Sequence, residues 1–215
     1  MVLLYYREVP YNSLSYRIAV ATALQTVERR SGIGPNEQDQ SYEIALLRAF
    51  REGKREAFTE LYLRYRQRVY AYCLRMLGNA QEAEDLFQEV FIRVWQRAYQ
   101  FTEEKSISGW IFTIAHNLCL NRIRDRKEHD SIDNYISLSS NNPEMGEDWA
   151  ARIQAALEQV PPENREPFVL FEYQGLSYQE ISEVMKLTIA AVKSRIYRAR
   201  EELRKILEPY YRDEQ

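Results

Sequence analysis

Hydrophobic residues recur every three to four positions through most of the chain, a spacing that predicts amphipathic helices rather than strands. Between residues 44 and 127 the pattern is interrupted near Gly53, at Gly78 and in the polar stretch 101–108. It therefore predicts helices at about 44–53, 57–77, 80–99 and 109–126. Two more are predicted at 149–160 and 163–173, separated by a pair of prolines.

The stretch 175–204 predicts a short helix, a tight turn and a second helix. Gly175 suits the left-handed position just past a helix end. Ser177 and Glu180 have the spacing of a capping box, and Thr188 can cap the second helix. The apolar side of the second helix is Ala191 or Val192, then Ile196, Ala199 and Leu203.

Positive charge concentrates on this second helix. Positions 186–205 hold seven basic residues against two acidic ones, a local charge of +5 in a chain whose total is -3. A helix-turn-helix places its second helix in the DNA major groove, where Arg, Lys and Ser can bond base edges and phosphates. On this stretch alone the alternative is a solvated basic face, or one that meets a membrane or an acidic partner.

The predicted helix at 80–99 has the most regular pattern, with an apolar stripe and an acidic face. The stripe is predicted to be buried and holds Ala83, Leu86, Phe87, Val90, Phe91, Val94 and Trp95. The acidic face includes Glu84, Asp85, Gln88 and Glu89. Carboxylates near a helix N-terminus are favoured by the helix dipole, so the acidic face does not by itself require a partner.

The helix predicted at 109–126 combines core, polar and basic positions. Six residues are predicted to be core: Trp110, Ile111, Ile114, Ala115, Leu118 and Cys119. Asn117 lies beyond the polar loop, and a side-chain amide beside aromatic rings could hold an unstacked base. The helix ends in a basic cluster of Arg122, Arg124, Arg126 and Lys127.

The composition is that of one or two soluble helical domains: 215 residues, 45% hydrophobic and 28% charged. Because the net charge is slightly negative, DNA binding would have to come from local patches. Cys73 and Cys119 lie within apolar helical patterns, which favours a buried structural role in a reducing cytosol. His116 lies three residues before Cys119, but two ligands do not make a zinc site. We expect no metal and no cofactor.

Residues 1–40 form an extension for which the spacing of hydrophobic residues does not predict a clear structure. The uncharged run 18–27 is too short to span a membrane, and Arg7 and Glu8 interrupt the place of a secretory apolar core, so we expect neither an anchor nor a signal peptide. Two interpretations of this extension remain open: a poorly ordered segment, and a docking helix over about 14–30.

The polar, acidic stretch 129–148 predicts a flexible linker.

Three blocks occur in an order and spacing typical of one family. They are EAFTELYLRYRQRVYAYCLRMLGNAQEAEDLFQEVFIRVWQ, GWIFTIAHNLCLNRIRDRK and PPENREPFVLFEYQGLSYQEISEVMKLTIAAVKSRIYRAREELR. With these blocks the chain resembles the extracytoplasmic-function sigma factors, the small two-domain branch of the bacterial housekeeping sigma family. The resemblance covers residues 41–207.

The resemblance implies a cytoplasmic specificity subunit of RNA polymerase without a catalytic site of its own. Core polymerase, through the clamp helices of its largest subunit, and promoter DNA are the implied partners, and an anti-sigma factor is expected from family habit. The implied polymerase-binding residues are Glu84, Asp85, Gln88 and Glu89. The residues implied to contact the downstream (minus ten) element are Trp110, Asn117, Arg122, Arg124 and Arg126, with the loop 101–109. The residues implied to contact the upstream (minus thirty-five) element are Lys193, Ser194, Arg195, Tyr197 and Arg198.

The resemblance also implies an all-α fold with two helical domains, region 2 at 41–128 and region 4 at 149–208, followed by a tail at 209–215. In the family the linker threads the polymerase cleft. The chain departs from the family at Lys186, Ala190 and Ala191, where a turn glycine and a Gly-Thr pair are common. These changes predict a different upstream sequence preference.

Two other classes compete with this interpretation. A DNA recombinase would need a nucleophilic Ser or Tyr among catalytic arginines in a mixed α/β domain, and the region before residue 128 has no strand pattern to build one. A two-domain repressor that acts without polymerase is the better alternative. It has no need of the acidic face on the 80–99 helix.

Overall fold

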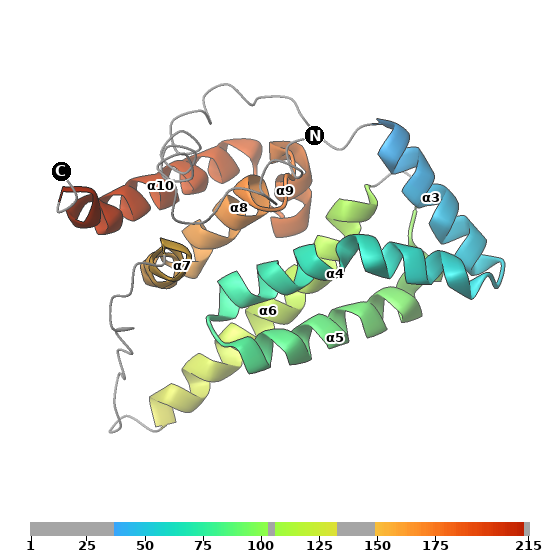
Figure 1. The fold of residues 1–215 in the computed structure, drawn as a ribbon, viewed down its shortest axis with the longest axis horizontal. Helices are drawn as coiled ribbons and strands as arrows, with labels where there is room; N and C mark the ends of the chain where they lie inside the picture. The colour runs from blue at the N-terminus through green and yellow to red at the C-terminus, as the bar shows by residue number, and fades with distance from the viewer. Residues whose placement is uncertain (1–36, 103–105, 133–148, 213–215) are drawn as a thin grey trace.

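The computed structural model describes residues 37–102, 106–132 and 149–212. Within these ranges every regular element is a helix, which confirms the predicted all-α fold (Figure 1). Most of the predicted extension at 1–40, most of the linker at 129–148 and the last residues of the tail lie outside the described residues.

The first bundle consists of α3 (Glu37–Arg51), α4 (Arg55–Leu77), α5 (Ala80–Arg97) and α6 (Ile107–Ile132), with a 3-10 turn, η2, at Ala98–Gln100. A tight turn makes α4 and α5 antiparallel neighbours. Gly78 takes a left-handed conformation with φ 68° and donates its N–H to the Leu74 carbonyl. Asn79 then caps α5, and its Oδ1 accepts the Glu82 N–H at 3.0 Å.

The second bundle consists of α7 (Trp149–Gln159), α8 (Pro162–Glu172), α9 (Tyr178–Met185) and α10 (Ile189–Arg212). Pro162 occupies the first turn of α8, where a missing N–H costs nothing. The predicted capping box of α9 is formed. The Glu180 N–H donates to Ser177 Oγ at 3.2 Å, and the Ser177 N–H donates to Glu180 Oε2 at 2.8 Å.

The turn between α9 and α10 depends on Lys186, which has φ 54° and ψ 44°. It is the one non-glycine residue with positive φ in the described part of the chain. The turn is closed by Ser182, whose carbonyl accepts the Leu187 N–H at 3.0 Å. Thr188 Oγ1 accepts the Ala191 N–H at 3.2 Å, so the predicted cap of the second helix is present.

Some boundaries and one core position differ from the prediction. Three helices are longer: α3 begins at Glu37, α6 continues to Ile132, and α10 continues to Arg212 with Pro209 inside it. The prediction that Trp95 is buried is wrong, because its side chain is 42% exposed. One side of its ring packs on Phe50 and Phe58, at centroid distances of 4.5 and 4.7 Å. Trp95 thus covers the edge of the core.

The two bundles pack against each other. Helix α6 contacts α9, and α4 contacts α7 and α8. In Figure 1 the second bundle, coloured orange to red, lies on one side of α4 and α6, while α5 lies on the other side. None of the described helices combines the length and apolarity needed to cross a bilayer. The described residues also contain no group of three or more His, Cys, Asp and Glu that could hold a metal ion.

Candidate nucleic-acid interface

The first half of α10, the predicted recognition helix, has one buried and one exposed face. Its inner face packs on α8 and α9. The buried residues are Val192, Ile196, Ala199 and Leu203, so Val192 rather than Ala191 belongs to the core. Its outer face exposes Lys193, Ser194, Tyr197 and Arg198. The fold therefore gathers four of the five predicted upstream residues on one accessible surface.

Arg195, the fifth predicted upstream residue, lies at the margin of this surface. It is half-buried, and its Nη1 donates to the Glu163 carbonyl at 3.4 Å. Lys193 is also oriented by a neighbour, since its ammonium lies 5.3 Å from the ring centroid of Tyr178. Tyr197 is 64% exposed on the same face.

Part of the positive charge of α10 is paired with carboxylates of the same bundle. Arg200 Nη2 lies 2.8 Å from Glu172 Oε1, and this largely buried pair joins α10 to α8. Arg204 Nη2 lies 2.6 Å from Glu201 Oε2 on the same helix. These two pairs reduce the positive charge of the second half of α10, where Arg204 and Lys205 stay exposed.

One face of α6 carries three of the five predicted downstream residues. Trp110, Asn117 and Arg124 are seven residues apart, which is close to two helical turns. Asn117 is exposed, and its Nδ2 donates to the Thr113 carbonyl at 2.7 Å. Trp110 is half-buried, with its ring centroid 5.3 Å from that of Phe101. An aromatic pair, an amide and a cation thus follow one another along this face.

The other two predicted downstream residues are less available. Arg122 is half-buried. Arg126 lies nine residues after Asn117 and so projects from the opposite side of α6. There its Nη2 lies 2.6 Å from Glu82 Oε2, and its Nη1 donates to the Leu77 carbonyl at 2.9 Å. Leu77 ends α4, where a carbonyl has no partner inside the helix, so Arg126 serves to join three helices.

The residues predicted to bind polymerase lie on the outer side of α5. Glu84, Asp85 and Gln88 are exposed, and Glu89 is half-buried. Gln88 Nε2 donates to Glu84 Oε1 at 3.2 Å. Arg93 Nε donates to Glu89 Oε1 at 3.0 Å, which neutralises that carboxylate. The negative charge of this face therefore comes mainly from Glu84 and Asp85.

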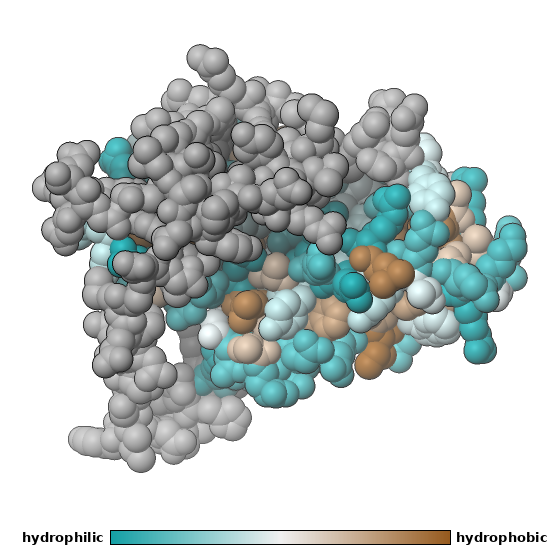
Figure 2. Space-filling view, viewed as in Figure 1, coloured by the Kyte–Doolittle hydropathy of each residue, from teal (hydrophilic) through white to brown (hydrophobic). Residues whose placement is uncertain are grey.

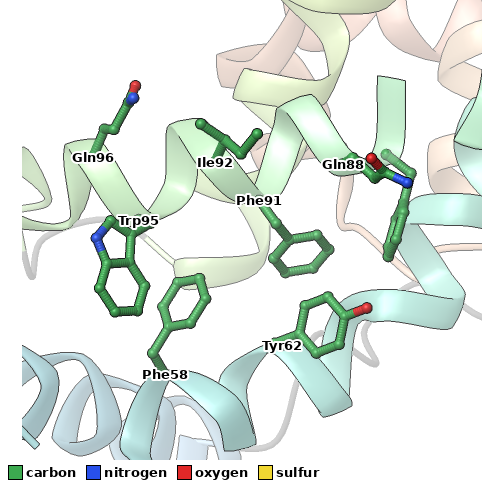
Figure 3. Close-up of a pocket in the computed structure, with 8 residues that line it drawn as sticks. Phe58, Tyr62, Gln88, Phe91, Ile92, Trp95 and Gln96 are labelled. Carbon is green, nitrogen blue, oxygen red and sulfur yellow. The ribbon is translucent and has the colours of Figure 1, made fainter. Parts of the chain in front are cut away.

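An aromatic pocket of about 460 Å³ continues this surface toward the C-terminal end of α5. Its lining residues are Phe58, Tyr62, Phe87, Gln88, Phe91, Ile92, Trp95 and Gln96. Figure 3 shows Phe58 and Tyr62 of α4 opposite Phe91 and Trp95 of α5. Ile92 is 56% exposed at the rim. The coloured part of the first bundle in Figure 2 is otherwise mostly hydrophilic, with separate hydrophobic patches.

The pocket was missed in the sequence because Trp95 fits the apolar stripe of its helix. Ile92 lies outside that stripe, and an isoleucine on the polar side of a helix is the signal that could have indicated an apolar surface. With Ile92 and Trp95 added, the outer side of α5 has an acidic half followed by an apolar half.

A buried polar cluster, also missed in the sequence, lies where the two bundles meet. Glu166 of α8 is only 1% exposed. Its Oε1 lies 2.6 Å from Nδ1 of His116 on α6 and accepts a hydrogen bond from the Tyr72 hydroxyl on α4. Burial, reinforced by the Glu166 charge, raises the pKa of Tyr72, which keeps its hydroxyl protonated as a donor. A glutamate among the buried positions of α8 was the available signal.

The two cysteines take no part in these surfaces. Cys73 and Cys119 are both free and fully buried in the first bundle. Burial raises the pKa of the Cys119 thiol, which disfavours the reactive thiolate.

Comparison with known families divides the chain at the same place as the fold does. Residues 61–129 match the family description Sigma-70 region 2, and residues 150–203 match Sigma-70, region 4. The first match spans α5 and most of α4 and α6, and the second runs from α7 into α10. The two matched segments therefore carry the candidate surfaces described above.

Full-length relatives show the same similarity. The RNA polymerase sigma-H factor of Pseudomonas aeruginosa is 30% identical over 192 residues, which cover 82% of this chain and 97% of that protein. The ECF RNA polymerase sigma factor SigW of Bacillus subtilis is 32% identical over 176 residues, covering 75% and 94%. Both similarities extend over both bundles.

Solved structures share the fold at lower identity. The sigma factor RpoE from Bartonella quintana, in complex with the anti-sigma factor NepR, is 23% identical with a TM-score of 0.62, covering 70% of this chain and 96% of that one. CnrH, in complex with the cytosolic domain of CnrY, is 24% identical with a TM-score of 0.58, covering 80% and 97%.

Proposed function

The chain belongs to the extracytoplasmic-function family of RNA polymerase sigma factors, and on this premise we propose which of its surfaces contacts each partner during transcription initiation. A sigma factor binds core RNA polymerase and directs initiation at promoters. Three surfaces of this chain have the chemistry that these two roles require. They are the outer face of α10, one face of α6 and the outer side of α5, and each suits a different partner.

The exposed face of α10 reads the upstream promoter element. Arg and Lys side chains bond guanine edges and phosphates in the major groove, and Ser bonds either. The proposed readers are Lys193, Ser194, Arg195, Tyr197 and Arg198. Lys186 takes the left-handed conformation that a turn glycine would supply, so the helix-turn-helix angle is retained despite the substitution. Sequence preference then depends on Ala190 and Ala191 and on the exposed readers.

The face of α6 that carries Trp110, Asn117 and Arg124 engages the downstream element. A flipped base needs a ring to stack on and a side chain to bond its exposed edge, and these residues offer both. Asn117 can leave its bond to the Thr113 carbonyl at small cost, because that carbonyl already accepts within the helix. Arg122 adds positive charge beside this face, and Arg126 supports α6 from behind.

The outer side of α5 docks on the clamp helices of core polymerase. Glu84, Asp85, Gln88 and Glu89 supply its polar, acidic half. Ile92 and Trp95 supply an apolar anchor at the aromatic pocket, since binding energy in protein interfaces concentrates in a few well-packed apolar and aromatic positions. An acidic face next to an apolar pocket has no role in a repressor that works without polymerase.

One observation supports this function above the others. The two segments that match sigma-factor regions also carry the three exposed surfaces, on α5, α6 and α10, whose side chains suit polymerase and promoter DNA. As a specificity subunit the chain acts in the cytoplasm without catalysis of its own. An anti-sigma factor is a further proposed partner, supported by the two solved complexes in which fold relatives are bound to such proteins.

Co-sedimentation and promoter binding test the proposal together. The chain mixed with purified core polymerase should form a stoichiometric complex, and the complex should select particular promoter fragments from a genomic pool. If the chain instead selected fragments by itself and failed to associate with polymerase, it would be a repressor and the proposal would be wrong.

A further inference from the structure

A series of contacts between cationic and aromatic side chains leads from a largely buried ion pair to the proposed upstream reader Lys193. It begins at Arg200 of α10, which pairs with Glu172 of α8 at 2.8 Å. The guanidinium carbon of Arg200 lies 5.8 Å from the ring centroid of Phe171, and the Phe171 ring is stacked on that of Tyr178. The ammonium of Lys193 lies 5.3 Å from the Tyr178 centroid. The contacts thus join α8, α9 and α10 (Figure 1).

We propose that Tyr178 is a positioning residue for promoter binding, whose ring holds the ammonium of Lys193 in the place from which that lysine contacts the upstream element. The inference rests on the proposed function, in which Lys193 is an upstream reader. It adds a residue of α9, outside the recognition helix, to those that determine promoter affinity. Tyr178 acts through Lys193 and has no contact with DNA of its own.

The backbone of Tyr178 has a defined place because of the way α9 begins. Tyr178 is the first residue of this helix and directly follows the cap Ser177. The capping box satisfies backbone donors at this end through both Ser177 and Glu180, and a capped end frays less than an uncapped one. Helix α9 also packs on α10. The distance from the Tyr178 backbone to the recognition helix is therefore set by local sequence and by packing.

The ring of Tyr178 is oriented by Phe171. The two ring centroids are 4.6 Å apart, and the ring planes are 7° from parallel. Both side chains are half-buried. Stacking stabilises such a pair beyond the burial of its surface, and it restricts the rotation of both rings. Tyr178 therefore offers Lys193 a ring of fixed orientation.

The contact orients Lys193 without removing it from solvent. Lys193 is exposed on α10. A cation is attracted to the face of an aromatic ring, but the ring carries no net charge, so the positive charge of the lysine is not neutralised. The ammonium can still bond a guanine edge or a phosphate. A lysine that is already oriented loses less side-chain entropy on binding DNA, and this is the advantage that Tyr178 provides.

A double-mutant cycle on promoter affinity tests the proposal. The complex of the unmodified chain with core polymerase first selects a promoter fragment from a genomic pool, and the affinity of each variant complex for that fragment is then measured. Tyr178→Leu should lower the affinity by about two- to fivefold, the factor that corresponds to a cation–π contact at an exposed site. In a Lys193→Ala background Tyr178→Leu should have no further effect, because the lysine that it positions is gone.

Two control variants separate positioning from other roles of the ring. Tyr178→Phe keeps the ring without its hydroxyl and should bind the promoter like the unmodified chain. Tyr210→Leu is the matched control, because Tyr210 is half-buried in the same bundle and its ring centroid lies 5.3 Å from the guanidinium carbon of Arg152, outside the proposed reading face. It should leave promoter affinity unchanged. Melting temperatures of the two leucine variants show how much stability each has lost.

Ring fluorination tests the same contact with little change in packing, and it serves if Tyr178→Leu does not fold. Phenylalanine analogues with increasing numbers of fluorine atoms at position 178 nearly keep the shape of the ring. They withdraw electron density from its face, which weakens the attraction of a cation. Promoter affinity should fall stepwise with fluorination when Lys193 is present, and it should stay constant in the Lys193→Ala background.

The proposal is overturned if Tyr178→Leu lowers promoter affinity by the same factor in both backgrounds, or if fluorination has no effect. A rise in affinity in Tyr178→Leu would show that the ring withholds Lys193 from DNA. Equal losses in Tyr178→Phe and Tyr178→Leu would assign the effect to the hydroxyl, and an equal loss in Tyr210→Leu would assign it to bundle stability. Failure of the proposed function would look different, because then the unmodified complex would select no fragment, or Lys193→Ala alone would leave affinity unchanged.

Discussion

The guanidinium of Arg126 lies 2.6 Å from the carboxylate of Glu82, joining α6 to the start of α5 on the side opposite Asn117. A residue from a basic cluster that resembles a DNA-binding segment is therefore used to support the helix. The two arginines of this cluster therefore differ. The side chain of Arg124 is 66% exposed and can meet a partner, whereas that of Arg126 is 38% exposed and is held by Glu82.

Replacing Arg126 should affect stability first. Arg126→Ala removes a partly exposed ion pair and the donor to the Leu77 carbonyl, and we expect a loss of about 1 kcal/mol in the free energy of unfolding. Chemical denaturation measures it. Arg124→Ala is the control and should change stability by less than about 0.5 kcal/mol. A larger loss in the free energy of unfolding for Arg124→Ala than for Arg126→Ala would show that Arg126 does not stabilise the fold.

Replacing Arg198 should affect promoter binding without affecting the fold. Arg198→Ala removes an exposed cation from the proposed reading face, and promoter affinity of the polymerase complex should fall by about 1–3 kcal/mol if the residue reads a base. Arg204→Ala removes the same charge from the second half of α10, where Arg204 pairs with Glu201, and should have little effect. Unchanged affinity and unchanged sequence preference in Arg198→Ala would remove this residue from the reading face.

Replacing Ile92 should weaken the association with core polymerase. Ile92 is exposed at the rim of the aromatic pocket, and truncating an anchor at a protein interface typically costs more than about 1 kcal/mol. Leu63→Ala is the matched control, because Leu63 is 51% exposed on α4 and does not line the pocket. Titration of labelled chain with core polymerase measures both. Equal losses for Ile92→Ala and Leu63→Ala would place the docking surface elsewhere.

Replacing Lys186 by glycine should stabilise the second bundle. A left-handed conformation costs an L-residue with a Cβ about 1–2 kcal/mol, part of which glycine loses again through its larger unfolded-state entropy. We expect Lys186→Gly to raise the melting temperature. Lys205→Gly, within α10, should instead lower stability by about 1 kcal/mol. A lower melting temperature in Lys186→Gly would mean that the lysine side chain contributes more than the strain costs.

Much of the fold follows from the sequence because each helix has its own local signals. The cap at Asn79, the capping box of Ser177 and Glu180, and the cap at Thr188 all depend on residues within a few positions of one another. Such short-range patterns are visible in the chain, and they fix where α5, α9 and α10 begin.

What the sequence did not reveal depends on residues far apart in the chain. Trp95 is exposed because Phe50 and Phe58 cover only one side of its ring, and no periodicity within α5 contains that information. Glu166 is separated from His116 by 50 residues, and their contact exists only once two bundles have packed. Local patterns identify surfaces, but the pairing of surfaces is a property of the tertiary fold.

Run-off transcription with purified core polymerase on genomic promoter fragments tests the central claim most directly. The chain should switch on initiation from a subset of fragments, with defined start sites that core polymerase alone does not use. No gain in specific initiation on any fragment, with a chain that is folded by circular dichroism, would contradict the assignment of this protein as a promoter-directing subunit.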